Sequence, residues 1–204
     1  MKRFASLFLR AAMALAFVLG PGASPALAGP VYHVAIDTGS LSGQGGYLDF
    51  LLMGLDNAAP VQATISNVAG RFDGASFTVG AAAGSVASGV TLDNSSGWTE
   101  FGQWAQFGGV FSFDIGFDTG AGFADGIGAG TSLSVALLDA SLNYLGTAGD
   151  VATFSLQPGQ DDVVVIGAGF ASVEANAVPE PSTAWLGAAG LLLLTGMARR
   201  RTLR

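Results

Sequence analysis

An antiparallel β-sandwich is the fold class that this sequence predicts, and three observations support it. Apolar residues recur at every second position in many short segments, as they do in strands that have one buried face. Segments rich in Gly, Asn, Asp and Ser separate these runs and are typical of turns. Between residues 29 and 177, no segment repeats its apolar residues with the period of a helix. About nine short strands of this kind predict a sandwich of jelly-roll type.

Three runs show the alternation best, and each places its apolar residues on one face. These residues are Tyr32, Val34 and Ile36 in VYHVAID, then Phe111, Phe113, Ile115 and Phe117 in GVFSFDIGFD, and Leu133, Val135 and Leu137 in TSLSVALLD. Further strands are expected in GGYLDFLLMGL, VQATISNV, ASFTVG, GVTLD, VATFSL and DDVVVIGAG. The small residues of GAAAGSVASG, at 80–89, predict a loop.

Charge is distributed unevenly along the 204 residues. Of the fifteen acidic residues, all but Glu180 lie between residues 29 and 177, where Arg71 is the one basic residue. An acidic middle of this kind repels phosphate groups, so the sequence argues against nucleic acid as a partner. The chain has no cysteine, which excludes disulfides, thiolate metal sites and thiol nucleophiles.

Residues 1–28 have the parts of a secretory signal peptide. A positive region with Lys2, Arg3 and Arg10 is joined to AAMALAFVL, an apolar core too short to span a bilayer. Small residues stand where signal peptidase cleaves, so we expect a signal helix that is removed at a site formed by Ala26, Ala28 and Gly29. No twin-arginine pair precedes the core, which favours the general secretion route.

Residues 178–204 form a second three-part signal. Pro179 and Pro181 flank Glu180 and keep the chain extended. An uncharged segment follows at about 183–198, long enough for a helix of about 24 Å. We expect one transmembrane helix, in contact with lipid at least transiently, with residues 29–177 outside. A basic cluster follows the helix and stays cytoplasmic by the positive-inside rule: Arg199, Arg200 and Arg201, within 199–204.

The segment VPEPSTAWLGAAGLLLLTGMARRR resembles the PEP-CTERM sorting signal of Gram-negative bacteria, which has a Pro-Glu-Pro triad, a membrane helix and an arginine cluster. The resemblance implies that an exosortase recognises the triad at 179–181 and cuts near it. It also implies an inner-membrane intermediate, followed by delivery to the cell surface, outer membrane or extracellular matrix. The family is associated with exopolysaccharide and biofilm. A permanent C-terminal anchor is the alternative.

The segment YHVAIDTGSLSGQGGYLDFLL, at 32–52, resembles the opening of a PEP-CTERM protein family, and TLDNSS and FSFDIGFD fit the same pattern. That family has no assigned activity, so the resemblance implies a class of protein and no mechanism. From the residues alone, TGSLSGQGG needs only to be a glycine loop between two strands.

Few residues favour catalysis. VVVIGAGFAS, at 163–172, begins like a dinucleotide-binding turn, but Ser172 stands at the third glycine and no crossover helix fits before the sorting signal. We interpret it as a final buried strand. His33 is the only histidine, and no Gly-x-Ser-x-Gly motif accompanies it, so a packed or surface role is expected. We predict no enzyme, no catalytic residue and no cofactor.

Two binding hypotheses remain for the middle of the chain. Asp114, Asp118 and Asp125 surround a glycine-rich loop and offer oxygen atoms to calcium, although their spacing matches no known calcium motif and solvated turns are the simpler reading. The aromatic run GWTEFGQWAQF supplies Trp98 and Trp104 as contacts for a sugar, with packing in the core as the alternative.

The sequence therefore predicts three parts: a signal peptide at 1–28, an acidic β-sandwich domain at 29–177 and a sorting signal at 178–204. We expect an exported structural or adhesive protein of the cell surface or matrix, handled by signal peptidase and exosortase and placed among exopolysaccharide. A lectin-type carbohydrate-binding module and a calcium-stabilised adhesin are the alternatives.

Overall fold

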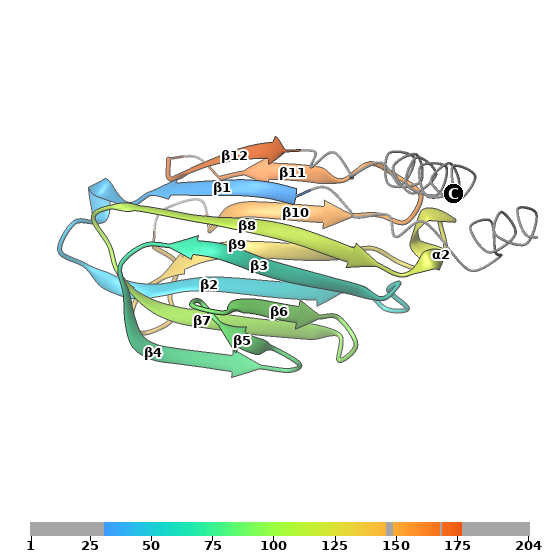
Figure 1. The fold of residues 1–204 in the computed structure, drawn as a ribbon, viewed down its shortest axis with the longest axis horizontal. Coiled ribbons are helices and arrows are strands. Elements are labelled where there is room, and N and C mark those ends of the chain that lie inside the picture. Colours follow the sequence, from blue (N-terminus) through green and yellow to red (C-terminus); the bar gives the residue numbers. More distant parts are fainter. Residues whose placement is uncertain (1–30, 146–148, 168, 177–204) are drawn as a thin grey trace, which may run out of the picture.

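The computed structural model describes residues 31–145, 149–167 and 169–176, which form two packed antiparallel sheets (Figure 1). The predicted signal peptide at 1–28 and the predicted sorting signal at 178–204 lie outside these residues. In the described part of the chain, no helix has the length and apolar character needed to cross a membrane.

Each sheet has six strands. Sheet A has the order β12-β1-β8-β3-β6-β5, with bounds Ala171–Asn176, Val31–Asp37, Val110–Thr119, Val61–Ala69, Gly89–Asp93 and Ala83–Ser85. Sheet B has the order β11-β10-β9-β2-β7-β4, with bounds Val163–Ile166, Asp150–Leu156, Thr131–Leu138, Gly45–Gly54, Trp98–Gln106 and Phe72–Val79. A 3-10 helix, η1 (Gly39–Leu41), follows β1, and the short helix α2 (Ala121–Ala124) follows β8.

Most connections cross from one sheet to the other. Only β5–β6, β9–β10 and β10–β11 are hairpins within a sheet. The first and last described strands, β1 and β12, are paired (Figure 1), and their register places Val31 opposite Asn176. The fold is therefore assembled from pairings between distant parts of the sequence, as is usual for a β-sandwich.

The core lies between the two sheets and is built from the inward faces that the alternation predicts. The apolar residues predicted to share a face in β1, β8 and β9 are all buried. Phe50 of sheet B and Phe113 of sheet A meet edge to face with ring centroids 5.1 Å apart. Aromatic pairs of this geometry add to the stabilisation that burial already supplies.

Asn94 links the two sheets through hydrogen bonds. Its Oδ1 accepts from the backbone N–H of Val61 at 3.1 Å. Its Nδ2 donates to the carbonyl of Ala59 and to Oγ1 of Thr131, both at 2.8 Å. Since Asn94 is only 8% exposed, these partners satisfy a buried amide that is costly to leave unpaired. The tie joins the start of β3 to β9 across the sandwich.

The structure corrects three details of the sequence analysis. It has twelve strands where about nine were expected. The segment 80–89, predicted to be a loop, contains β5, because Gly84 and its neighbours pair with β6. The final strand was predicted to be buried, but β11 is an edge strand with Val163 and Val165 more than half exposed, and β12 follows it.

Candidate functional site

The outer face of sheet B carries four partly exposed aromatic side chains, which we call the aromatic strip: Tyr47, Phe77, Trp98 and Trp104. On β7, Trp98 and Trp104 share the face opposite to the buried Phe101, because strand side chains alternate. The predicted sugar contacts therefore lie together on one surface. The rest of the predicted aromatic run, Phe101 and Phe107, is buried in the core.

Three members of the strip touch one another across neighbouring strands. The ring centroid of Tyr47 lies 5.1 Å from that of Phe77 and 5.0 Å from that of Trp104, and both pairs are edge to face. Trp98 lies six residues from Trp104 on the same strand, which corresponds to about 20 Å at about 3.3 Å per residue. The strip thus runs along β7 with a compact cluster toward one end and Trp98 at the other.

Two glycines allow the rings to lie close to the backbone. The ring of Phe77 covers Gly102 so closely that a Cβ at position 102 would overlap it. A Cβ added at Gly45 would lie 3.0 Å from Cζ2 of Trp104. Because these positions lack side chains, the rings pack down on the sheet instead of standing away from it.

Acidic side chains lie beside the strip. Asp49 of β2 is opposite Gly102 on one side and Ala136 on the other, and Asp150 of β10 is opposite Ala136. Glu100 lies diagonal to Asp49, two residues before Gly102 on β7. Together with Tyr144, which follows β9, these groups form a carboxylate cluster next to the aromatic strip.

Asp49 is the buried member of this cluster, with 5% of its surface exposed. Its Oδ1 has no hydrogen-bond partner among the described residues. Burial, and next the negative charge of Glu100, raise the pKa of Asp49 to about 7. The charge of Asp150, followed by burial, raises the pKa of the Tyr144 hydroxyl. Asp49 therefore carries a proton in much of the population at neutral pH.

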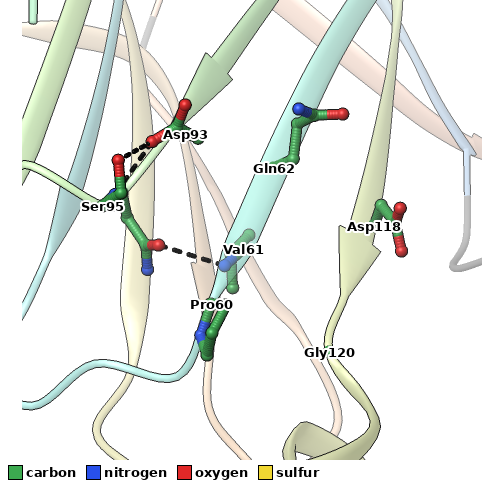
Figure 2. Close-up of a pocket in the computed structure, with 8 residues that line it drawn as sticks. Pro60, Val61, Gln62, Asp93, Ser95, Asp118 and Gly120 are labelled. Carbon is green, nitrogen blue, oxygen red and sulfur yellow. Dashed lines mark hydrogen bonds between the residues drawn. The ribbon is translucent and has the colours of Figure 1, made fainter. Parts of the chain in front are cut away.

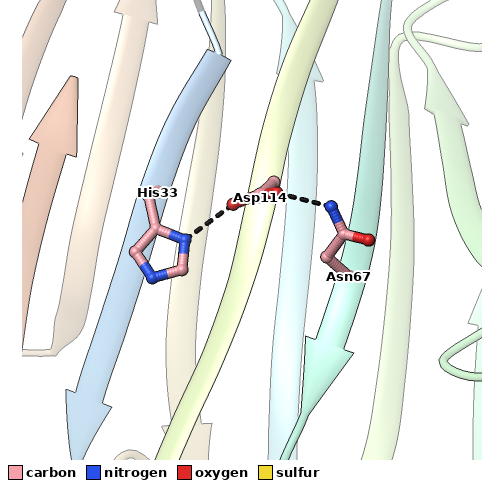
Figure 3. A network of polar contacts seen from close by, with 3 residues as sticks. All are labelled: His33, Asn67 and Asp114. Atoms are coloured by element: carbon pink, nitrogen blue, oxygen red, sulfur yellow. Dashed lines mark hydrogen bonds and ion pairs between the residues drawn. The ribbon is translucent and has the colours of Figure 1, made fainter. Parts of the chain in front are cut away.

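The outer face of sheet A holds a different network (Figure 3). Nδ1 of His33 lies 2.7 Å from Oδ1 of Asp114, and Nδ2 of Asn67 donates to Oδ2 of the same carboxylate at 2.7 Å. The hydrogen bond from Asn67, and next that from His33, lower the pKa of Asp114. No hydroxyl group of the described residues bonds to the imidazole, so the arrangement orients His33 without giving it a nucleophile.

The predicted calcium ligands are not brought together. Asp114 is engaged by His33 and Asn67. Asp118 lines an open depression of about 360 Å³ at one end of sheet A (Figure 2). Asp125 is an exposed residue beyond α2. Across the ranges that the structure describes, no three His, Cys, Asp or Glu side chains gather as a metal site does.

Two acidic residues, Asp93 and Asp118, line this depression. Asp93 and Asp118 lie opposite Gln62 on the two strands that flank it. Oδ1 of Asp93 accepts from the backbone N–H of Ser95 at 3.0 Å and also from its hydroxyl group (Figure 2). Asp93 is therefore a turn residue that caps the end of β6, which is a common role for aspartate.

Comparison of the chain with protein-family models, with curated proteins and with solved structures found no match.

Sequence reasoning missed Tyr47, Phe77 and Asp49 as members of the site. A signal for two of them is present in GGYLDFLL, where Tyr47 and Asp49 alternate with the apolar Leu48 and Phe50 and so share the outer face. No comparable signal marks Phe77, because β4 has no fully buried residue and no clear alternation.

Proposed function

We propose that this chain is an exported protein of the cell surface or extracellular matrix, and that it adheres to polysaccharide through the outer face of sheet B. One observation carries the proposal: four aromatic side chains from three strands share that face and remain partly exposed. Large apolar side chains at a surface cost solvation free energy, and their grouping on one face marks sites that meet a partner.

Aromatic rings suit a sugar for a physical reason. The C–H groups on one side of a pyranose ring form an apolar patch with slight positive charge, and the face of an aromatic ring is negative. Trp and Tyr also have few rotatable bonds, so ordering them costs little entropy. A polymer laid along β7 meets Trp98 at one end and the cluster of Tyr47, Phe77 and Trp104 at the other.

The terminal sequences support export. The signal peptide at 1–28 and the resemblance of 178–204 to a PEP-CTERM signal favour passage through the inner membrane, a single transmembrane helix at about 183–198 and handling by an exosortase. A jelly-roll-like sandwich delivered in this way acts as a structural or adhesive component among exopolysaccharide. No catalytic role is proposed.

The test is electrophoresis of the full-length chain through native gels that contain soluble polysaccharide. Wild-type protein is expected to be retarded by at least one polymer. Trp104→Ala and Trp98→Ala should each weaken binding about thirtyfold, since truncation of a central aromatic contact typically costs about 2 kcal/mol. Ile127→Ala is the matched control, because Ile127 is an exposed apolar residue outside sheet B. Equal mobility of wild type with and without every polymer would remove the proposal.

A further inference from the structure

The carboxylate cluster is not explained by aromatic stacking. Asp49 is almost fully buried on the outer side of sheet B, with Oδ1 unpartnered among the described residues. A buried carboxyl oxygen without a partner is costly, and native proteins rarely keep one without a use. On the adjoining strands it lies opposite Gly102, which the ring of Phe77 covers, and opposite Ala136.

Glu100 lies between the two tryptophans on the surface of β7. The outward positions of this strand are Trp98, Glu100, Gly102 and Trp104 in order. Glu100 is partly exposed, unlike Asp49. A polymer that stacks on both tryptophans therefore passes over a carboxyl group, which can accept hydrogen bonds from sugar hydroxyls.

We infer that the ligand of this face is an extended, uncharged polysaccharide, that Glu100 is its polar contact, and that Asp49 holds Glu100 in place from the neighbouring strand. This inference rests on the proposed function and names its substrate class. It adds two side chains, Glu100 as a binding residue and Asp49 as a positioning residue.

Charge decides against an anionic polymer. The strands of sheet B contain no Lys or Arg, and the face carries Asp49, Glu100 and Asp150. Arg71 directly precedes β4 and borders the sheet beside Gln106, beyond Trp104, so it does not offset the carboxylates between the two tryptophans. Uronate or phosphate groups placed there would meet the like charges of Glu100 and Asp150, which is unfavourable. The hydroxyl groups of an uncharged sugar are instead favoured there, because they donate hydrogen bonds that carboxyl oxygens accept. The spacing of about 20 Å between Trp98 and Trp104 requires several linked sugars and not a single one.

The role of Asp49 follows from its contact with Glu100. While Asp49 is protonated, the two carboxyl groups carry one charge and attract through a shared proton; once Asp49 ionises, they repel. The raised pKa of Asp49 places this change near pH 7. The other titratable groups near the pair are Asp150 of β10 and Tyr144 after β9, together with Tyr47 on the same strand as Asp49. The residue opposite Asp49 on β9 is Ala136 and the residue opposite Glu100 on β4 is Val79, and neither titrates.

The experiment compares neutral and anionic polymers on the full-length chain. Hydroxyethyl cellulose and galactomannan are the neutral probes, and alginate is the uronate probe. Retardation by at least one neutral polymer and none by alginate is expected. Glu100→Ala should weaken neutral binding about tenfold, as loss of a hydrogen bond to a charged group does. Glu174→Ala, which removes an exposed carboxylate from sheet A, is the control and should bind like wild type.

The pH profile tests Asp49. Wild-type binding to the neutral polymer should weaken as pH rises through about 7. Asp49→Asn, which stays uncharged, should bind at all pH values as wild type does below this point. Should Asp49→Asn fail to fold by circular dichroism, Glu100→Gln carries the test, because removal of the partner carboxyl should abolish the inflection.

The outcomes separate the two proposals. Trp104-dependent retardation by alginate overturns the substrate class and leaves the adhesive function standing. Neutral binding that Glu100→Ala does not change overturns the polar contact. A flat wild-type profile, or an inflection that survives both Asp49→Asn and Glu100→Gln, overturns the positioning role of Asp49. Absence of binding to every polymer overturns the proposed function as well.

Discussion

The ring of Phe77 lies directly over Gly102 on the neighbouring strand, in the space that a side chain at position 102 would occupy. Phe77 in turn contacts Tyr47, which contacts Trp104. A single missing Cβ therefore allows three rings to form one compact surface. If this surface binds sugar, its geometry depends on a residue that never touches the ligand.

Gly102→Ala should consequently displace Phe77. We expect a loss of about 1–3 kcal/mol in the free energy of unfolding, as for other insertions into packed sites. Chemical denaturation measures it. Gly109→Ala is the matched control, since a Cβ there meets nothing within 4 Å. The double variant Phe77→Ala/Gly102→Ala should lose less than the sum of the single variants, and strict additivity would contradict the contact.

Asp49 should make stability fall with rising pH. Its pKa is about 7 in the folded chain and about 3.9 when unfolded, so the unfolded state loses its proton first. The folded state is thus penalised progressively between about pH 4 and pH 7, by on the order of 4 kcal/mol in total. Asp49→Asn should remove this dependence. Urea unfolding of both proteins at pH 4.5 and pH 8 measures it, and equal pH dependence in the two would refute the assignment.

Asp114 should behave in the opposite sense. Its pKa is lowered in the folded state, so its stabilising contribution is present above its unfolded pKa of about 3.9 and is lost as pH falls through the folded value. Asp114→Asn should cost less than about 1 kcal/mol at pH 6, because the network is partly exposed. The deficit should disappear in strong acid. A deficit that persists below pH 3 would indicate that the carboxylate charge is not its cause.

Asn94→Ala should be among the most destabilising polar substitutions. It leaves the backbone N–H of Val61 and the carbonyl of Ala59 without their side-chain partner at a buried position. We expect a loss of about 2–4 kcal/mol by thermal or chemical unfolding. Asn143→Ala is the control, because Asn143 bonds to Asp139 at an exposed turn and should cost far less. Similar losses in the two variants would argue against the link between the sheets.

The proposed sorting predicts a change in covalent mass. Protein recovered from exosortase-containing cells should lack residues 1–28 and the segment after the triad at 179–181, whereas cells without exosortase should retain that segment. Glu180→Ala should block the second cut, and Glu174→Ala, which lies outside the triad, should not. Intact mass spectrometry distinguishes these forms. Retention of the C-terminal segment in both cell types would show a permanent anchor.

The alternation of residues predicted much of this architecture. It identified the inner faces of β1, β8 and β9, since a period of two is a local property of the chain. It also places Trp98 and Trp104 on the face opposite to that of Phe101 and Phe107, because they lie an odd number of residues apart. Strand count and edges were harder: β5 has three residues without apolar alternation, and the exposure of β11 follows from its place at the edge of sheet B.

The burial of Asp49 depends on residues of neighbouring strands, which the local sequence around Asp49 does not identify. The residues opposite it, Gly102 and Ala136, lie far away in the chain, and so does Phe77, whose ring covers Gly102. Pairing register between distant strands determines this arrangement, and a shift by one residue would move Asp49 to the other face. Such positions are found from the assembled sheet and not from the alternation of β2 alone.

The pairing of Val31 with Asn176 means that the chain enters and leaves the sandwich at one place. An attachment to the cell envelope through either end of the chain would therefore hold the domain at the same end of the sandwich. Trp98 lies toward this end of sheet B, because its neighbour Gly97 bonds to Gly54 at the end of β2, while Trp104 lies farther out. A polymer bound along the strip would then pull the domain parallel to its strands. Separating strands in that direction requires many hydrogen bonds between them to break at once.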